Sequence, residues 1–527
     1  MPATAAAAPR HGALMVCGTS SDAGKSTVVT GLCRLLARRG LRVAPFKGQN
    51  MSLNAMVTAE GGEMGRAQWL QAVAARAEPE VAMNPVLLKP TSERASQVVV
   101  LGRPTGVEDA VTYHDTKGRL VDVVDSALAD LRTRYDVVVC EGAGSPAEIN
   151  LLDHDLVNLG LARRAGIPAV LVGDIERGGV FAHLYGTVAL LPTDLAALIR
   201  GFVINRFRGD RSLLGGATAE LENRCGVPTF GVLPHLGHLA LDAEDSLVLD
   251  QVGRPSGPRP PATAGLDVAV IRLPRLANFT DLDPLTMEPG VHVRWVATPD
   301  SLGDPDLIVI PGTRATVDDL RWLRANGLAA AIGARLRSSS PTPPVLLGLC
   351  GGYQMMGERI DDPHAVESSA AQSSGLGWLP VRTVFEVEKL TRLSTATATV
   401  MPDALSLRGY EIRHGRMHPG PSYSSWFDAA GSHTDTSGEA VSASAESGAI
   451  LGTTLHGLFE NDAFRSWFLA AVARRRGRVR QPSGLDYSLA REEQIDRIAD
   501  ACEAQLDLDQ IWRLIETGAL SPRAGRA

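Results

Sequence analysis

A cysteine flanked by glycines has the surroundings of a catalytic nucleophile. The apolar run 345–349 leads directly into Cys350, which is followed by Gly351 and Gly352. This pattern predicts a buried strand, a tight turn and a helix start, with glycines that allow a strained backbone at the turn. The N-terminus of a helix favours a thiolate. Cys350 alone would more often be a buried structural residue, but these neighbours together predict a catalytic thiol.

Two further groups would complete such a site. An ordinary thiol has a pKa of about 8.5 and needs a base at neutral pH. His456, which follows the apolar run 449–451, is the best candidate for that base. A neutral imidazole can take the thiol proton and later pass it to departing ammonia. Gly351 and Gly312, the second of which lies in a Pro-Gly turn, are predicted to donate backbone N–H groups to an oxyanion hole.

A loop near the N-terminus predicts phosphate binding. The segment 18–27 (GTSSDAGKST) lies between the apolar run 13–16 and a predicted helix over residues 24–39. Backbone N–H groups, the helix N-terminus and the Lys25 ammonium would together hold a polyphosphate. A strict P-loop has glycine at position 19, so this loop is a variant. The residues predicted to bind nucleotide here are Thr19, Gly24, Lys25, Ser26 and Thr27.

Oxygen ligands near this loop are candidates for a magnesium site. The Ser26 hydroxyl is placed to bind Mg²⁺ directly. Glu141 directly follows the apolar run 137–140, and a carboxylate at a strand's carboxyl end beside a P-loop is a natural Mg²⁺ ligand. Glu63, at the start of a predicted helix, is a further candidate, although an acidic residue there would also stabilise the helix dipole.

Other polar residues directly follow short apolar runs. Lys47 is predicted to neutralise a phosphate or a substrate carboxylate, and Asp174 and Arg177 are candidates for the same substrate and phosphate site. The amide of Asn205 is predicted to bind an adenine edge. Each such residue, taken singly, is more often a plain polar residue at a strand end. Their convergence at one sheet edge beside a P-loop predicts a site.

The elements that must position these residues are short buried strands alternating with helices. In the first half, apolar runs that are mostly bounded by Gly, Pro or Asp occur at 13–16, 43–46, 137–140, 169–172, 202–204 and 230–233. In the second half they occur at 268–271, 292–296, 307–310 and 345–347. Such runs are typical of parallel strands in β-α-β units. The sequence therefore predicts an α/β fold with two doubly wound domains, and ligands at the carboxyl ends of the strands.

Composition divides the 527 residues into segments, because one hydrophobic core cannot serve a chain of this length. A Pro- and Gly-rich stretch separates the two α/β halves and predicts a linker. A stretch rich in Ser, Ala and Gly predicts a disordered insertion in the second half. The predicted segments are a tail at 1–11, a phosphate-binding α/β domain at 12–250, a linker at 251–265, a second α/β domain at 266–475 with the insertion at 422–448, and a C-terminal segment at 476–527 containing a packing helix at 489–508.

Charge, hydropathy and cysteine content argue against several classes of protein. The net charge of −7 does not indicate the basic surface that binds nucleic acid or an acidic membrane, and neither partner is expected. No long uncharged apolar run predicts a transmembrane helix, and the N-terminus lacks the pattern of a secretion signal. The six cysteines form no C-x-x-C pair, which counts against zinc and a disulfide framework. A cytoplasmic location is therefore predicted.

Both sites together resemble a known family. The Cys350 turn with Gln354 four residues later, and His456, look like a class I glutamine amidotransferase domain. The N-terminal loop looks like a dethiobiotin-synthetase-type ATPase domain. Fused in this order, the two resemble the cobyrinic acid amidases of cobalamin biosynthesis. The segments that most resemble cobyric acid synthases among them are 46–54 (FKGQNMSLN), 141–150 (EGAGSPAEIN), 173–182 (GDIERGGVFA) and 275–283 (RLANFTDLD).

The resemblance implies a reaction. ATP would phosphorylate the b, d, e and g carboxylates of a corrinoid, adenosylcobyrinic acid a,c-diamide, and ammonia released from glutamine at Cys350 would displace each phosphate. It implies Gln354 in glutamine binding, Glu63 and Glu141 as Mg²⁺ ligands, and Asp155 in handling the corrinoid carboxylate. Because free ammonia is mostly protonated at neutral pH, we expect the strand-end faces of the two domains to approach each other with a path between them.

Some points depart from the family pattern or stay open. Triad amidotransferases usually carry Glu two residues after the catalytic His, where this chain has Leu458. Cys350 and His456 would then act as a dyad, or Glu460 would orient the imidazole. The alternatives are a cobyrinic acid a,c-diamide synthase, a dimeric partitioning-type ATPase switch with an inactive second domain, and stand-alone dethiobiotin synthesis, which leaves the second half without a purpose. The oligomeric state, homo-oligomers included, is open.

Overall fold

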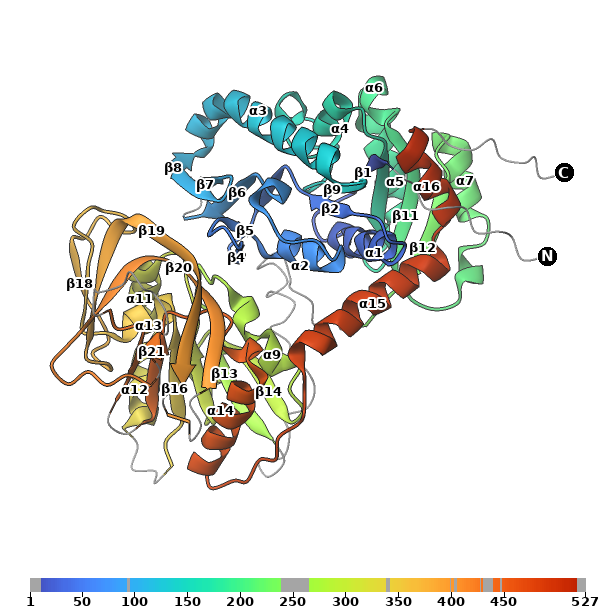
Figure 1. Ribbon diagram of the computed structural model, residues 1–527. Helices are drawn as coiled ribbons and strands as arrows, with labels where there is room; N and C mark the ends of the chain where they lie inside the picture. Colours follow the sequence, from blue (N-terminus) through green and yellow to red (C-terminus); the bar gives the residue numbers. More distant parts are fainter. Residues whose placement is uncertain are drawn as a thin grey trace.

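The computed structural model has two α/β domains, as the sequence predicts (Figure 1). It describes residues 11–91, 95–237, 265–337, 342–398, 400–401, 405–426, 428–429, 439–445 and 448–518. The predicted linker at 251–265 lies outside these ranges except for its last residue, and so does all but residue 11 of the predicted tail at 1–11.

The N-terminal domain is built on a parallel sheet that carries the phosphate loop. Across the sheet, its strands are β12 (Thr229–Pro234), β11 (Ile199–Phe207), β10 (Ala169–Asp174), β1 (Gly12–Gly18), β9 (Val137–Glu141) and β2 (Val43–Phe46). Because β1 lies in the middle, its carboxyl end brings the loop between β10 and β9. The predicted apolar runs of the first half all lie in these strands.

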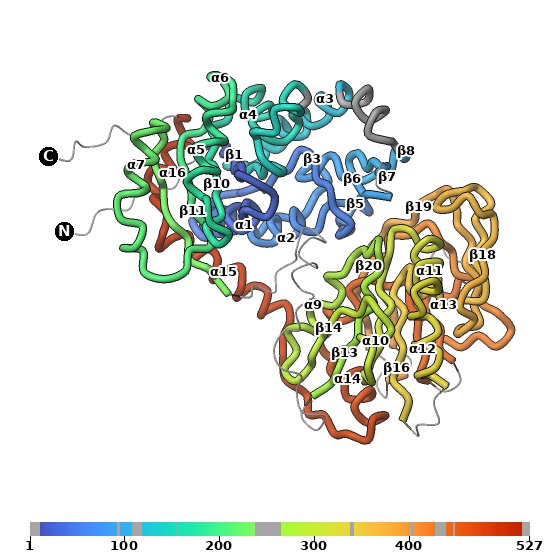
Figure 2. The backbone as a smooth tube through the Cα atoms, turned by 180° about the vertical axis from the view of Figure 1, so that it is seen from behind, coloured from blue at the N-terminus to red at the C-terminus, as the bar shows by residue number. Residues whose placement is uncertain are grey.

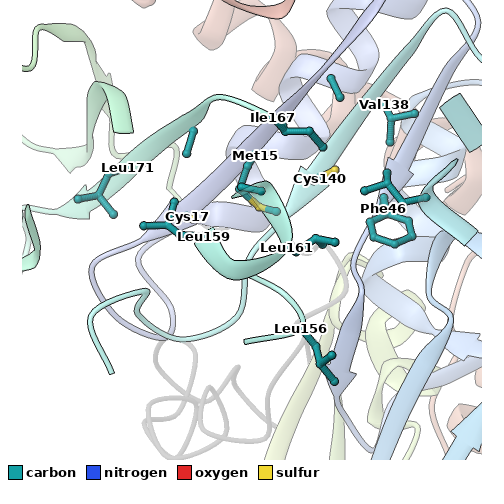
Figure 3. Close-up of a cluster of buried hydrophobic side chains, with 14 of the residues drawn as sticks. Met15, Cys17, Phe46, Val138, Cys140, Leu156, Leu159, Leu161, Ile167 and Leu171 are labelled. Carbon is teal, nitrogen blue, oxygen red and sulfur yellow. The ribbon is translucent and has the colours of Figure 1, made fainter. Parts of the chain in front are cut away.

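Strand β1 shows why the runs are continuously apolar. Ala13, Met15 and Cys17 pack into a core on one face of the sheet, and Leu14 and Val16 pack into a core on the other face. Side chains of a strand alternate between faces, so a strand covered on both sides needs apolar residues at every position. Figure 3 shows part of the first core, where Met15 and Cys17 lie near Cys140 and Leu159.

Helices cover both faces of this sheet, and small sheets extend one end of the domain. The helices are α1 (Lys25–Arg38), α2 (Arg66–Ala74), α3 (Ala110–Arg134), α4 (Leu159–Ala165), α5 (Val180–Leu190), α6 (Thr193–Ala196) and α7 (Ala217–Cys225). One small sheet comprises β3 (Gln49–Met51), β6 (Val86–Pro90), β7 (Ala95–Val100) and β8 (Arg103–Asp109), and another pairs β4 (Ala55–Val57) with β5 (Glu63–Gly65).

The C-terminal domain is built on a second, largely parallel sheet. Its strands in order are β14 (Val291–Val296), β13 (Leu266–Ile271), β15 (Leu307–Ile310), β16 (Val345–Leu349), β23 (Ile450–Thr453) and the antiparallel edge strand β22 (Ser442–Ser444). The helices are α9 (Asp283–Thr286), α10 (Pro299–Leu302), α11 (Thr316–Ala325), α12 (Leu328–Leu336), α13 (Gly351–Met356) and α14 (Asp462–Arg475).

A long antiparallel pair of strands lies between this sheet and the N-terminal domain. It belongs to a mixed sheet of β18 (Gln372–Ser374), β17 (Arg359–Asp361), β19 (Val381–Ala398) and β20 (Leu405–Pro419), with β21 (Asp428–Ala429) paired to β19. In Figure 2, β19 and β20 lie on the side of the C-terminal domain that faces β5 and β6. Residues of β20 therefore contact both domains.

The chain returns to the N-terminal domain at its end. Helix α15 (Tyr487–Gln505) crosses from one domain to the other, and α16 (Leu508–Thr517) packs against β1 and β12 (Figure 1). Ile495, Ile498, Ala499 and Cys502 are buried in the core that α1 also fills, which confirms the predicted packing helix at 489–508. The predicted C-terminal segment is thus part of the N-terminal domain's core.

The predicted disordered insertion at 422–448 is wrong for the residues that the structure describes. Trp426 is almost fully buried and packs against Phe464 and Phe468. Val441 and Ala443 are also buried, and Ser442–Ser444 is the edge strand β22. The low hydrophobicity of the segment hid these contacts, because a few well-placed apolar residues are enough to fix an edge strand. Residues 427, 430–438 and 446–447 lie outside the description.

The two domains contact each other through the motifs that carried the family resemblance. The backbone N–H of Ala55 donates to the Asn278 side chain at 3.0 Å, and the N–H of Phe279 donates to the Asn54 side chain at 3.0 Å. An apolar cluster surrounds this exchange, with Ala55, Met56, Val57, Leu87 and Val99 from one domain and Tyr410 and Ile412 from the other. The domains therefore meet directly beside residues 278–281.

Candidate active site

Cys350 lies on a strained turn between β16 and α13. Its backbone has φ 48° and ψ −109°, a region that non-glycine residues rarely occupy. A Cβ at Gly351 would lie 2.7 Å from the Thr313 side chain, and one at Gly352 would lie 2.0 Å from the carbonyl oxygen of Ile310. The glycines thus allow β16, the turn and the loop after β15 to pack closely, as the sequence predicts for a nucleophile.

His456 contacts Cys350 and is held on its far side by an aspartate. The imidazole and the Cys350 thiol lie beside each other in one pocket, and both flank Gly312. Its Nδ1 lies 2.7 Å from Asp281 Oδ2, and Asp281 Oδ1 accepts from the Gly457 N–H at 2.9 Å. Burial by itself would lower the pKa of His456, but Asp281 and Cys350 outweigh it and raise that pKa to about 10. The arrangement therefore favours a protonated imidazole between Asp281 and Cys350.

Asp281 was not predicted from the sequence. It lies in the segment 275–283, which was noted for its resemblance and not for chemistry. The sequence left Glu460 open as the group that orients His456, but Glu460 pairs with Arg66 at 2.9 Å and with Arg491 at 3.4 Å. A buried acid far from the histidine in sequence is visible only in the fold. Its one sequence signal is an Asp inside a long family-like motif.

Strand β20 closes the other side of the thiol and imidazole. The Tyr410 ring stacks on the His456 ring with centroids 5.1 Å apart, and the two residues exchange backbone hydrogen bonds. Cys350 Sγ lies 3.9 Å from the Ile412 carbonyl oxygen. Both Tyr410 and Ile412 belong to the apolar cluster between the domains. The catalytic groups therefore contact residues that touch the N-terminal domain.

The other predicted residues of this site lie around one pocket. The pocket has an empty volume of about 480 Å³, which includes space open to solvent. Gln354 is buried in its wall and accepts from Thr316 Oγ1 at 3.3 Å. A Cβ at Gly312 would lie 3.5 Å from the His456 ring. The lining residues include Lys89, Asn278, Gly312, Thr313, Arg314, Thr316, Cys350, Gln354, Glu367, Lys389, Arg413, His414 and His456.

The phosphate loop has the geometry that the sequence predicts. Gly24 has φ 97°, and α1 starts at Lys25. Lys25 Nζ donates to the carbonyl oxygens of Ser20 at 2.9 Å and Gly144 at 3.2 Å, so the ammonium lies across the mouth of the loop. The Thr19 N–H donates to the carbonyl oxygen of Val172 in β10, so the position where this loop departs from a strict P-loop is fixed to the neighbouring strand. This is a cradle for an anion at a helix N-terminus.

Glu141 is the buried acid of this site. One oxygen accepts from Ser26 Oγ at 3.0 Å and from Lys47 Nζ at 3.0 Å, and the other accepts from the Gln71 amide. A hydroxyl and a carboxylate beside a phosphate cradle suit Mg²⁺, which takes one or two protein oxygens and completes its shell with phosphate and water. Within the described ranges, no three His, Cys, Asp or Glu side chains gather as a metal cage.

The structure places Glu63 between two lysines, and its role as a magnesium ligand stays a prediction. Its carboxylate is fully buried and accepts from Lys389 Nζ at 2.5 Å and from Lys89. Burial alone would raise the pKa of Glu63, but Lys389 and Lys89 lower it to about 2. Lys389 comes from the C-terminal domain, so Glu63 lies at the domain boundary. Two ammonium groups satisfy its charge, whereas the Ser26 hydroxyl bonds to Glu141.

Three other predicted residues lie near the loop, and each interacts with another residue of the N-terminal domain. Asp174 accepts from Arg206 at 2.8 Å, and Arg177 is largely exposed with its guanidinium 3.7 Å from Asp22. The Asn205 amide donates to the Ala23 carbonyl oxygen at 3.1 Å, so this hydrogen bond helps to fix the backbone of the loop. The structure brings these residues to one sheet edge, as predicted, and their contacts with nucleotide or substrate stay predictions.

Asp155 has a structural role in this fold. Its oxygens accept from the backbone N–H groups of Val157 at 2.9 Å, Asn158 at 2.7 Å and Gly160 at 2.8 Å. Both oxygens thus hold the turn that leads into α4, and one of them also accepts from the first turn of that helix. The predicted contact of Asp155 with the corrinoid carboxylate stays a prediction, and it competes with this structural role.

Two family models match the two domains. A CobQ/CobB/MinD/ParA nucleotide binding domain matches residues 14–248, and a CobB/CobQ-like glutamine amidotransferase domain matches residues 267–464. A protein named cobyric acid synthase from Mycobacterium sp. (strain KMS) is 50% identical over 512 residues, covering 96% of this chain and 97% of the relative. The chain belongs to the cobyric acid synthase family.

Other members are similar over the same length. The cobyric acid synthase of Nocardia farcinica is 50% identical over 520 residues, covering 96% of this chain and 97% of its own. That of Streptomyces coelicolor is 48% identical over 514 residues, covering 97% of each. A solved glutamine amidotransferase, 16% identical, aligns with a TM-score of 0.30 over 39% of this chain and 97% of its own.

Family membership and the two domains establish the type of enzyme. A nucleotide-binding domain and a glutamine amidotransferase domain on one chain of this family make it a glutamine-dependent amidoligase. The cobalamin pathway that the resemblance implied is the family's own. None of the described helices combines the length and the apolar character that crossing a bilayer requires.

Proposed function

We propose that this enzyme converts adenosylcobyrinic acid a,c-diamide to adenosylcobyric acid by amidating the b, d, e and g carboxylates with ATP and glutamine. The observation that carries the proposal is the Cys350–His456–Asp281 arrangement, in a pocket whose wall includes Lys89 of the nucleotide-binding domain. The shared name of the most similar relatives supports the choice of substrate.

In the C-terminal domain, Cys350 would release ammonia from glutamine. The thiolate attacks the side-chain carbonyl carbon, and the backbone N–H groups of Gly351 and Gly312 stabilise the oxyanion. The His456 imidazolium gives its proton to the leaving nitrogen, so that ammonia departs and a thioester remains. His456, now neutral, takes a proton from water, which attacks the thioester and releases glutamate.

Asp281 is proposed as the residue that orients His456. A carboxylate on Nδ1 holds that nitrogen protonated and leaves Nε2 to exchange the proton with sulfur. Its second oxygen is fixed by the Gly457 N–H, so the carboxylate cannot rotate away from the ring. The proposed triad thus takes its acid from the 3-10 helix Phe279–Leu282, which precedes the nucleophile in the chain, in place of the acid usually found two residues after the histidine.

In the N-terminal domain, the loop would bind ATP and a substrate carboxylate would attack its γ-phosphorus. The backbone cradle and Lys25 hold the phosphates, and Ser26 and Glu141 would hold Mg²⁺, which neutralises phosphate charge. Lys47, 3.0 Å from Glu141, is placed to neutralise the incoming carboxylate. ADP leaves with the β-phosphate oxygen, and ammonia then displaces phosphate from the acyl phosphate to form the amide.

The contact between the domains supports direct transfer of ammonia. Asn278 lines the pocket of Cys350 and bonds to Ala55 in the N-terminal domain, and Asn54 bonds back to the residue after Asn278. Ammonia released at this boundary can reach an acyl phosphate before it is protonated and diluted. Water exclusion would also protect the acyl phosphate.

The test is mass spectrometry of the corrinoid after incubation of the pure enzyme with ATP, Mg²⁺ and glutamine. Adenosylcobyrinic acid a,c-diamide should show successive replacements of hydroxyl by amino groups, ending at the b, d, e and g amides. Cobyrinic acid itself is the control substrate. If it is amidated at positions a and c while the a,c-diamide is not consumed, the enzyme is an a,c-diamide synthase and the proposal is wrong.

A further inference from the structure

The pocket of Cys350 has two lysines in its wall that the mechanism above does not use. Lys389 comes from β19 of the amidotransferase domain, and Lys89 comes from β6 of the nucleotide-binding domain. Both side chains are almost fully buried, at 4% and 5% exposure. A lysine is rarely buried unless its charge is matched. These two buried ammonium groups therefore need anionic partners.

The matching charge for both lysines is one carboxylate. Glu63 receives Lys389 on one oxygen at 2.5 Å and Lys89 on the other. Lys389 also donates to the Gln97 side chain at 3.1 Å, whereas Glu63 is the single hydrogen-bonding partner of the Lys89 ammonium among the described residues. Two ammonium groups against one carboxylate leave a surplus of one positive charge.

The other charged groups of the pocket wall do not remove this surplus. The protonated His456 is balanced by Asp281 at 2.7 Å. Arg314 lies 3.4 Å from Glu367, so that pair is balanced. Arg413 is paired with Glu411 at 2.8 Å and with Glu439. Burial, followed by the repulsion of Lys389, lowers the pKa of His414 to about 4, so this ring adds no charge at neutral pH. A pocket with one uncompensated buried cation fits an anionic group of its ligand.

We propose that Lys89, together with Lys389, binds the α-carboxylate of glutamine, so that the nucleotide-binding domain completes the glutamine site. The inference rests on the proposed function. Glutamine has one reactive end, the carboxamide at Cys350, and its other end carries the carboxylate that the surplus cation requires. Glutamine would then bind fully only when Lys89 is in place, which links glutamine hydrolysis to contact between the domains.

The competing explanation is that Lys89, Glu63 and Lys389 only tie the two domains together. Both explanations predict harm when Lys89 is lost, so loss of activity by itself does not separate them. The two explanations differ in which substrates should show altered kinetics. A residue that binds the α-carboxylate affects only substrates that have one, whereas a structural tie affects all substrates equally.

The experiment compares Lys89→Met with the unmodified full-length enzyme in a glutaminase assay without corrinoid. A charged hydrogen bond that is lost from a buried site raises KM by roughly 10- to 100-fold. We expect that increase for L-glutamine, with kcat changed much less. With L-glutaminamide, which has an amide in place of the α-carboxylate, unmodified enzyme and Lys89→Met should have similar kcat/KM. Equal losses for both substrates would overturn the proposal.

A matched variant, Glu63→Gln, breaks the ion pairs and leaves both lysines. Under the proposal KM for L-glutamine stays the same or falls, because the cations lose a competing anion. Under the tie explanation this variant raises KM as Lys89→Met does. Ammonium-dependent corrinoid amidation, measured on the same preparations, reports the proposed function separately: its failure in the unmodified enzyme would count against the substrate, and not against Lys89.

Discussion

At the scale of single residues, reactivity depends on how Cys350 and His456 are held. The strained backbone of Cys350 and the Asp281 carboxylate on His456 are both costly arrangements that the surrounding fold imposes. Together they hold the sulfur and the imidazole beside each other and keep the imidazole protonated. Two substitutions test this arrangement.

Cys350→Ser should abolish glutamine-dependent amidation and leave ammonium-dependent amidation intact. A serine hydroxyl is not ionised by this imidazole, and the phosphate site does not need the thiol. The measurement is product formation with glutamine or with added ammonium chloride at alkaline pH. Loss of both activities in a variant that stays folded by circular dichroism would show that the sites are not separable.

Asp281→Asn should lower glutaminase kcat by roughly 10²-fold or more, in line with the loss of an oriented acid–base group. The pKa of His456 is raised to about 10 with Asp281 present, so the imidazolium is kept below that pH and lost above it. Without the carboxylate, burial lowers the pKa of His456, and the alkaline limb of the kcat/KM profile should move to lower pH. An unchanged profile would contradict the orienting role.

At the scale of elements, α15 and α16 stabilise a domain that lies far from them in sequence. Arg34 of α1 pairs with Glu492 of α15 at 2.5 Å, and Arg38 pairs with Asp500 at 2.6 Å. Beneath these pairs, Gly231 of β12 lies against the link between α15 and α16, where a Cβ would be 2.2 Å from the Gln505 carbonyl oxygen. The absence of a side chain at this position is what lets the link approach the strand.

Gly231→Ala should therefore destabilise the enzyme by about 1–3 kcal/mol, the usual cost of overpacking against backbone. The measurement is urea unfolding followed by a probe of the N-terminal domain. Gly186→Ala in α5 is the matched control, since a Cβ there meets nothing within 4 Å. It should be neutral or stabilise by about 0.4–1 kcal/mol. Equal midpoints for the two variants would show that the link is loosely packed.

At the scale of the whole molecule, the domain boundary and the glutaminase site are the same place. Asn54 supports Phe279, which lies two residues before Asp281, and Tyr410 contacts both His456 and the N-terminal domain. Movement of one domain against the other would therefore disturb the imidazole. This gives a physical route by which the state of the nucleotide site can affect glutamine hydrolysis.

Asn54→Ala should lower glutaminase kcat/KM about tenfold, because it leaves the buried Phe279 N–H without its acceptor, at a cost of roughly 1–3 kcal/mol. Ammonium-dependent amidation should change less, since the phosphate loop keeps its bonds. Both rates are measured on one preparation. If ammonium-dependent amidation falls as far as glutaminase activity, Asn54 serves the fold in general and does not couple the two sites.

Much of this protein follows from sequence by itself. Local patterns such as the loop before α1 and the glycines around Cys350 predict strand-turn-helix units, because their backbone demands are met within a few residues. Apolar runs such as 137–140 predict buried parallel strands for the same reason. The P-loop, the thiol, the histidine and the two α/β domains were all predictable.

Only the tertiary structure decided which distant groups meet. Asp281 reaches His456, Lys89 enters the pocket of Cys350, Glu63 lies between two lysines, and α15 returns to the first domain. Each of these contacts joins residues that lie far apart along the chain. Local spacing contains no information about such pairs, because their distance depends on how the two domains pack and not on any period within a segment.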